Sequence, residues 1–162
     1  MGLNKKGYIG DVLLWIVVIG VFSMAAIMTY MMNSEIKTAV DAEPSITANA
    51  KTQVDNIVTP MPAWIDGVVA ILIFGSAITL FFSVLLIRDF PGFFVFIWIL
   101  VGIMILVAAI LSNTYFEFLQ DPDVAVAAAD FTFLNFIMNN YVIAAIFWGV
   151  SLGAAMLLNN QT

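Results

Sequence analysis

Two long apolar runs, separated by a short break, dominate the hydrophobic pattern in the middle of the chain. They cover residues 68–87 and 93–111, or 20 and 19 residues, and neither contains a charged side chain. At about 1.5 Å per residue, each would form a helix about 28–30 Å long, which matches the hydrocarbon thickness of a bilayer. The break, residues 88–92, ends in Pro91-Gly92, which favours a turn followed by a new helix. The pattern predicts a transmembrane helical hairpin.

Two further apolar runs without charges lie nearer the ends of the chain, at residues 12–32 and 141–158. Helices with no polar face suit lipid rather than water, because the bilayer solvates an apolar surface on all sides. The composition agrees, since 63% of residues are hydrophobic and 10% are charged, against about one quarter charged in soluble domains. The predicted fold class is an all-α integral membrane protein, with four transmembrane helices in one domain over residues 1–162.

The first polar segment, residues 33–63, is predicted to be an outer loop that joins the first two spans. Within it, Ser45 is placed to cap a short helix that runs through Val58. Three prolines break the segment, namely Pro44, Pro60 and Pro62. The loop is either a connector lying on the surface or a segment that binds a partner.

A second polar segment, residues 112–140, separates the third apolar run from the fourth. Asp121-Pro122-Asp123 predicts a turn, with Asp123 placed to cap the helix that follows. This helix, residues 124–138, is too short to span a bilayer. We expect it to lie at the membrane surface or to re-enter the membrane without crossing it.

Aromatic residues beside the apolar runs are candidates for anchors at the membrane–water interface. They are Trp64, Tyr115, Phe116 and Phe118. Asp66 is predicted at the N-terminus of the second helix, where the helix dipole favours an anion; an ion-pathway carboxylate is the alternative. Trp98 and Trp148 lie in the middle of their spans, where we expect them to pack between helices.

Small residues on one face of the fourth helix indicate a site of close helix packing. Ala145, Gly149 and Gly153 recur every four residues, a spacing that lets another helix approach closely. Gly75 and Ser76 make a weaker version of this face on the second helix. The partner helix belongs either to the same chain or to a second copy in a homo-oligomer.

The distribution of lysine and arginine predicts the orientation, because these residues favour the cytoplasmic side of short segments. With a cytoplasmic N-terminus, Lys5, Lys6 and Arg88 all lie inside, and four spans return the C-terminus to the same side. The outer segments then hold nine carboxylates against two lysines, a net charge near −7. The prediction is a protein with both termini cytoplasmic, or in an equivalent interior, and an acidic outer face.

Composition also excludes several kinds of chemistry. The chain has no Cys and no His, which removes disulfides, thiol catalysis and the commonest general base and metal ligand. A coupled transporter would need a charged residue within the membrane, and the four apolar runs have none. The formal charge of −6 argues against a nucleic-acid partner. Without nucleotide-binding, serine-hydrolase or intramembrane-protease motifs, we predict no enzymatic activity, no catalytic residue, no cofactor and no metal.

Polar side chains within the apolar runs have a structural explanation. Each hydroxyl can donate to a backbone carbonyl one turn earlier in its helix. These residues are Ser23, Thr29, Ser76, Thr79, Ser83 and Ser151.

Four carboxylates cluster along the second polar segment: Glu117, Asp121, Asp123 and Asp130. Their spacing lacks the calcium-binding pattern of an EF-hand. We interpret them as a solvated acidic rim, with docking of a basic partner as the functional possibility.

The C-terminal half contains FPGFFVFIWILVGIMILVAAIL from residue 90, followed by SNTYFE at residues 112–117 and FLNF at residues 133–136. This succession resembles small uncharacterised polytopic membrane proteins of prokaryotic viruses and mobile elements. The resemblance implies a viral membrane component, in a lipid-containing particle or in the host envelope, with lipid and capsid or membrane proteins as partners.

Three functions are compatible with the sequence. The first is a structural protein of a virion membrane that contacts a surrounding protein assembly. The second is a holin-like or channel-type oligomeric pore. The third is an accessory subunit of a larger membrane complex.

Overall fold

Helices make up nearly all of the chain in the computed structural model, which describes residues 7–85 and 92–159, with side chains for 13–79, 81 and 98–154. No strand occurs within these ranges, so the predicted all-helical fold is confirmed there. The helices are α1 (Gly7–Ala42), α2 (Ala48–Val58), α3 (Met61–Leu85), α4 (Gly92–Phe118), α5 (Pro122–Ala128), α6 (Thr132–Asn139) and α7 (Tyr141–Asn159).

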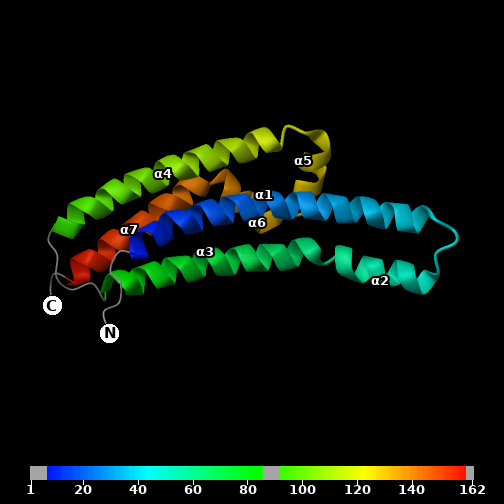
Figure 1. Cartoon of the computed structure of the whole chain (residues 1–162), viewed down its shortest axis with the longest axis horizontal. Helices are drawn as coiled ribbons and strands as arrows, with labels where there is room; N and C mark the ends of the chain where they lie inside the picture. The colour runs from blue at the N-terminus through cyan, green and yellow to red at the C-terminus, as the bar shows by residue number, and fades with distance from the viewer. Residues whose placement is uncertain (1–6, 86–91, 160–162) are drawn as a thin grey trace.

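The long helices α1, α3, α4 and α7 form a bundle in which α1 and α7 each contact both α3 and α4 (Figure 1). Within the described residues α3 and α4 are not a closely packed pair, so the two helices of the predicted hairpin lie apart, with α1 and α7 between them. The turn between α1 and α2 lies at one extremity, and the start of α4 and the end of α3 lie towards the other. Within the described ranges, three helical stretches are long and apolar enough to cross a membrane, or four if the bent pair α6–α7 is one span. The break at residues 88–91 and the lysines at positions 5 and 6, which support the predicted orientation, lie outside the described residues.

The first helix is longer than the sequence pattern predicts. We expected it to end at Met32, but α1 continues for ten more residues to Ala42. This extension contains neither proline nor glycine, and it packs against α2. At 36 residues α1 is about 54 Å long, so it extends well past a hydrocarbon core of about 30 Å.

The predicted outer loop, residues 33–63, is therefore largely helical. The short helix within it ends at Val58 as predicted, but its N-cap is Thr47 rather than Ser45. Thr47 has the extended backbone of a cap, and its Oγ1 accepts from the backbone N–H of Ala50 at 3.4 Å. The hydroxyl of Ser45 instead donates to Glu43 at 2.8 Å.

A second cap differs by two residues from the prediction. We expected Asp123 to cap a helix from residue 124, but Asp121 is the cap of α5. Its Oδ1 accepts from the backbone N–H of Asp123 at 2.9 Å. Pro122 follows at the first helical position, which is favourable because proline has no N–H to leave unbonded there.

The helix predicted over residues 124–138 is two helices, and α4 already occupies residues 112–118 of the second polar segment. The break between α5 and α6 contains Phe131, whose side chain is fully buried. A single straight helix would not bring this ring into the core and also return the chain to α7. The axis then bends by 75° between α6 and α7, with only Asn140 between them.

The small-residue face of α7 packs within the chain. Ala145, Gly149 and Gly153 are all buried, and α7 lies against α4. A Cβ at Gly149 would lie 2.6 Å from Cγ1 of Val101 on α4, closer than two carbons approach. Of the two partners that the sequence left open, the structure supports a helix of the same chain.

The weaker face on α3 divides into a buried part and an open part. Ser76 is buried and its hydroxyl donates to the carbonyl of Ile73 at 2.9 Å. Gly75 lies at the surface of a groove of about 210 Å³ and has no atom within 4 Å of a built Cβ.

The two mid-span tryptophans differ in burial. Trp148 is buried and its Nε1–H donates to the carbonyl of Ile73 at 3.4 Å. Trp98, which we also expected to pack between helices, is 51% exposed, although its ring would lie 3.8 Å from a Cβ at Gly153 on α7.

The prediction for the membrane hydroxyls is confirmed where side chains are described. Each donates to a carbonyl three or four residues earlier. The pairs are Ser23–Ile19, Thr29–Ala25, Ser76–Ile73, Thr79–Gly75 and Ser151–Phe147. The sixth predicted residue, Ser83, lies outside the described side chains.

The packing of α7 on α4 is testable with a matched pair of substitutions. Gly149→Ala forces a methyl group against Val101. Such overpacking lowers the free energy of unfolding by about 1–3 kcal/mol. Gly75→Ala gains the same helix propensity without a clash. We expect a lower midpoint of thermal unfolding in detergent for Gly149→Ala than for Gly75→Ala. Equal midpoints would contradict the packing.

Candidate functional site at the polar end of the bundle

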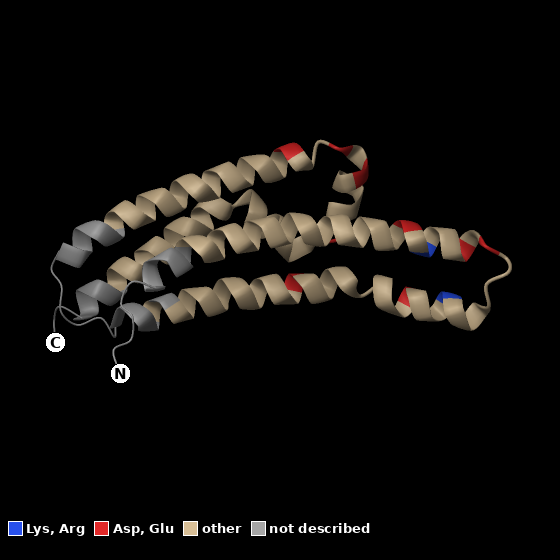
Figure 2. Ribbon diagram, viewed as in Figure 1, with Lys and Arg blue, Asp and Glu red and all other residues tan. Residues whose placement is uncertain are grey.

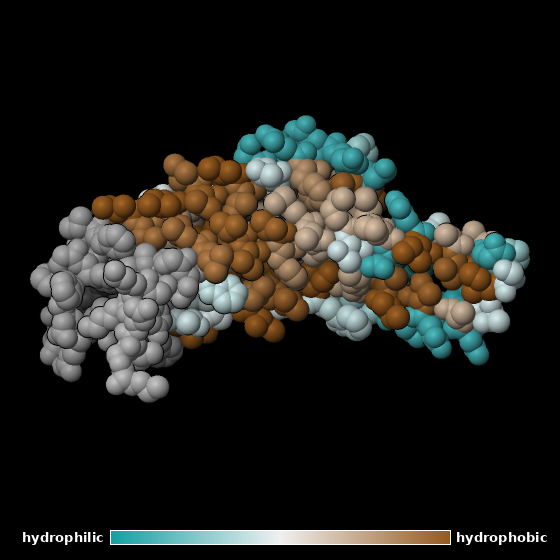
Figure 3. Space-filling view, viewed as in Figure 1, coloured by the Kyte–Doolittle hydropathy of each residue, from teal (hydrophilic) through white to brown (hydrophobic). Residues whose placement is uncertain are grey.

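The charged side chains that the structure describes gather in one part of the molecule. Among the side chains described, nine carboxylates and two lysines all lie between the middle of the molecule and the α1–α2 turn (Figure 2). The rest of the described surface in this view is largely apolar, with hydrophilic residues over the α1–α2 turn and the α4–α5 turn (Figure 3). The net charge of this end, nine acids against two lysines, is −7. The bundle therefore has an apolar body and a strongly acidic end.

The extension of α1 and the helix α2 form a hairpin, residues 34–58, that carries part of this charge. Lys37 on α1 makes an ion pair with Asp55 on α2 and also donates to Thr59 at 3.2 Å. The hydrogen bond from Lys37 holds the pKa of Asp55 below its usual value, with a second contribution from Thr59. Lys51 on α2 donates to the backbone carbonyl of Asp41 at 2.6 Å. These contacts tie the two helices together.

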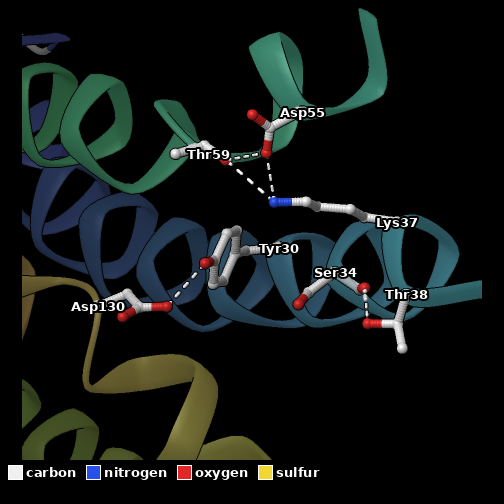
Figure 4. A network of polar contacts seen from close by, with 7 residues as sticks. All are labelled: Tyr30, Ser34, Lys37, Thr38, Asp55, Thr59 and Asp130. Atoms are coloured by element: carbon white, nitrogen blue, oxygen red, sulfur yellow. Dashed lines mark hydrogen bonds and ion pairs between the residues drawn. The ribbon is translucent and has the colours of Figure 1, made fainter. Parts of the chain in front are cut away.

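A pocket of about 350 Å³ lies where this hairpin joins the bundle. Its polar groups come from three parts of the chain: Tyr30, Ser34 and Lys37 on α1, Thr59 before α3, and Asp130 between α5 and α6 (Figure 4). The hydroxyl of Tyr30 donates to Oδ2 of Asp130 at 2.7 Å. The ring of Tyr30 also packs edge-on against Phe131, with centroids 5.3 Å apart.

Asp66 caps a helix that is distant in sequence. It is the sixth residue of α3, so it does not lie at the N-terminus of its own helix as we expected. Its two oxygens accept from the backbone N–H groups of Phe133 and Leu134, both at 2.9 Å. These are the second and third residues of α6, whose own N-cap has no side-chain hydrogen bond. Asp66 thus supplies the capping carboxylate that α6 lacks.

Tyr115 also connects helices rather than facing the membrane surface. The sequence places it among the interfacial anchors, but its side chain is fully buried. Its hydroxyl donates to Oδ1 of Asn135 on α6, and Nδ2 of Asn135 donates to the carbonyl of Ala128 at 2.5 Å. Tyr115 is buried because Asn135 offers a partner for its hydroxyl within the bundle.

The other predicted anchors are more accessible. Trp64 and Phe116 are 62% and 63% exposed, as an interfacial anchor requires, and Phe118 is half-buried. Trp64 lies two residues beyond the pocket residue Pro62.

The four carboxylates of the predicted acidic rim do not converge on one point. Asp121 caps α5, Glu117 accepts from Asn113 at 2.8 Å, and Asp130 turns towards Tyr30. Within the described residues, no group of three or more carboxylates is arranged to hold a metal ion. Glu117, Asp121 and Asp123 remain exposed, so a solvated rim describes these three.

Sequence reasoning missed the pairing of Tyr30 with Asp130 and that of Tyr115 with Asn135. The signal available was a polar residue in a mostly apolar stretch, as at positions 30 and 135. That signal predicts that a partner exists, because a buried polar group needs one. It does not say which residue is the partner, since the pairs are 100 and 20 residues apart.

The cap on α6 can be tested with a series at Asp66. Asp66→Ala leaves two N–H groups of α6 without an acceptor, so we expect a loss of about 1–3 kcal/mol in the free energy of unfolding. Asp66→Asn keeps one acceptor oxygen, so its free energy of unfolding should lie between those of Asp66→Ala and the natural chain. Unfolding in detergent, with hydrogen exchange of α6, measures both. Asp41→Ala, an exposed carboxylate, is the control, and an equal effect there would contradict the cap.

In the comparisons with known proteins, no protein-family model, no curated protein and no solved structure matches this chain.

Proposed function

We propose that the chain is a non-catalytic structural protein of a membrane, which it crosses four times with both termini on the cytoplasmic or equivalent interior side. The observation that carries this proposal is the separation of an apolar body from an end of net charge −7. A bundle with this distribution is stable with its body in lipid and its acidic end in water.

The fourth crossing rests on α7. It has 19 residues and is about 28 Å long, which is sufficient for a bilayer with little tilt. Its bend of 75° from α6 allows α6 to lie across the end of the bundle while α7 crosses. A re-entrant path for α6 and α7 is the competing topology.

The acidic end is the docking surface for a surrounding protein assembly under this proposal. The α1–α2 hairpin lies beyond the predicted span, because α1 continues ten residues past Met32, a length of about 15 Å. Its exposed acids are Glu35, Asp41 and Glu43, and the α4–α5 turn adds Glu117, Asp121 and Asp123. Such a surface favours a basic partner, because complementary charge raises the association rate and the specificity of docking.

The membrane in question is that of a virion, on the strength of the resemblance to viral membrane proteins described above. The holin-like pore and the accessory subunit are the functions against which this placement is tested.

The topology can be measured with single cysteines, because the natural chain has none. Ser45→Cys in the α1–α2 turn and Thr162→Cys at the C-terminus should react from opposite sides with a membrane-impermeant maleimide. With four crossings, intact cells label Ser45→Cys, and Thr162→Cys reacts only after permeabilisation. Labelling of both from outside would support the re-entrant path and contradict four crossings.

Fractionation of the native source separates the three functions. A structural virion protein should co-migrate with particles and be released when detergent strips their lipid. A pore should dissipate the membrane potential when the chain is expressed alone. Recovery only from cell membranes, bound to host subunits, would overturn the virion placement.

A further inference from the structure

We propose that the pocket between α1, the α2–α3 junction and Asp130 binds the headgroup of a zwitterionic phospholipid. The pocket holds a cation and a carboxylate on different walls, as a phosphate linked to an amine requires. This inference rests on the membrane insertion proposed above, and goes beyond it by assigning a lipid site.

Lys37 provides the group that binds phosphate. An ammonium has three N–H donors, and here Asp55 and Thr59 accept two of them. No further hydrogen bond from Lys37 is made within the part of the chain that the structure describes. One N–H donor of Lys37 is therefore available to a phosphate oxygen, and the ion pair with Asp55 fixes the position of the ammonium group.

Asp130 provides the group that binds the amine. One oxygen, Oδ2, accepts from Tyr30 at 2.7 Å, and no described residue donates to the other. The ring of Tyr30 lies between Lys37 and Asp130 in Figure 4, and an aromatic ring beside a carboxylate favours a cation. Lys37, Asp55 and Asp130 together carry a net charge of −1, which disfavours a headgroup that is only anionic.

The position of the pocket favours a lipid over a soluble compound. Pro62 and Ala63 line it, and the next residue, Trp64, is 62% exposed. Exposed tryptophan is enriched at the level of lipid headgroups. Val58 and Pro62 give the pocket an apolar wall. Its volume of about 350 Å³ lies in the range of small-molecule sites, about 300–1,000 Å³.

Native mass spectrometry of the full chain in non-ionic detergent tests the assignment. The probes are phosphatidylethanolamine, phosphatidylcholine and phosphatidylglycerol with identical acyl chains, and soluble phosphoethanolamine as a competitor. We expect both zwitterionic lipids to bind about tenfold more tightly than phosphatidylglycerol, because only they place a cation at Asp130. Soluble phosphoethanolamine should displace bound lipid at least tenfold less well than phosphatidylethanolamine does, since it lacks the acyl chains.

Two variants with matched controls locate the binding. Asp130→Asn removes the charge but keeps an oxygen for Tyr30, and should abolish the preference for zwitterionic lipids; Asp123→Asn, on the exposed rim, should keep it. Lys37→Met should weaken binding of all three lipids about tenfold, and Lys51→Met should not.

Two results for the natural chain would overturn the proposal without any variant. One is equal binding of phosphatidylglycerol, and the other is equal competition by soluble phosphoethanolamine. Retention of the preference in Asp130→Asn would also overturn it. Membrane insertion is read separately, from resistance of the chain to alkaline extraction, so failure of the lipid site and failure of the proposed function are distinguishable.

Discussion

The carboxylate of Asp66, bonded to the first turn of α6, is the interaction on which the arrangement of the polar end depends. A helix that begins among apolar side chains has N–H groups without partners, and each costs free energy when water is absent. Phe131, which precedes α6, has no side-chain oxygen with which to cap it. Because Asp66 lies on α3, its two hydrogen bonds also fix α6 relative to the bundle.

Other polar side chains of the bundle, buried or partly buried, join helices in a similar way. Tyr115 ties α4 to α6 through Asn135, and Ser112 donates to the carbonyl of Met138 at 3.0 Å. Tyr141 at the start of α7 donates to the carbonyl of Ile16 on α1 at 2.5 Å. No buried side-chain nitrogen or oxygen among those described lacks a partner. Such pairing gives α6 and the bend into α7 a defined position.

Both proposals for the polar end concern surfaces that lie beside these helix-joining contacts. The α1–α2 hairpin extends the acidic surface away from the apolar body, where a partner can reach it. The pocket with Tyr30, Lys37 and Asp130 lies at its base. A lipid headgroup bound there would contact the base of the hairpin and the α5–α6 connection together. Lipid binding and docking would then act on the same structural unit.

The sequence by itself determined the all-helical fold, the apolar body and the acidic end, because length, hydropathy and charge are local properties that lipid and water sort directly. It also determined that Gly149 and Gly153 allow a close approach. The tertiary structure decided which helix approaches them, that α1 continues to Ala42, and that residues 124–138 break in two. It alone decided that Asp66 caps α6, since that contact joins residues 67 and 68 positions apart, and hydrophobic periodicity carries no information about such partners.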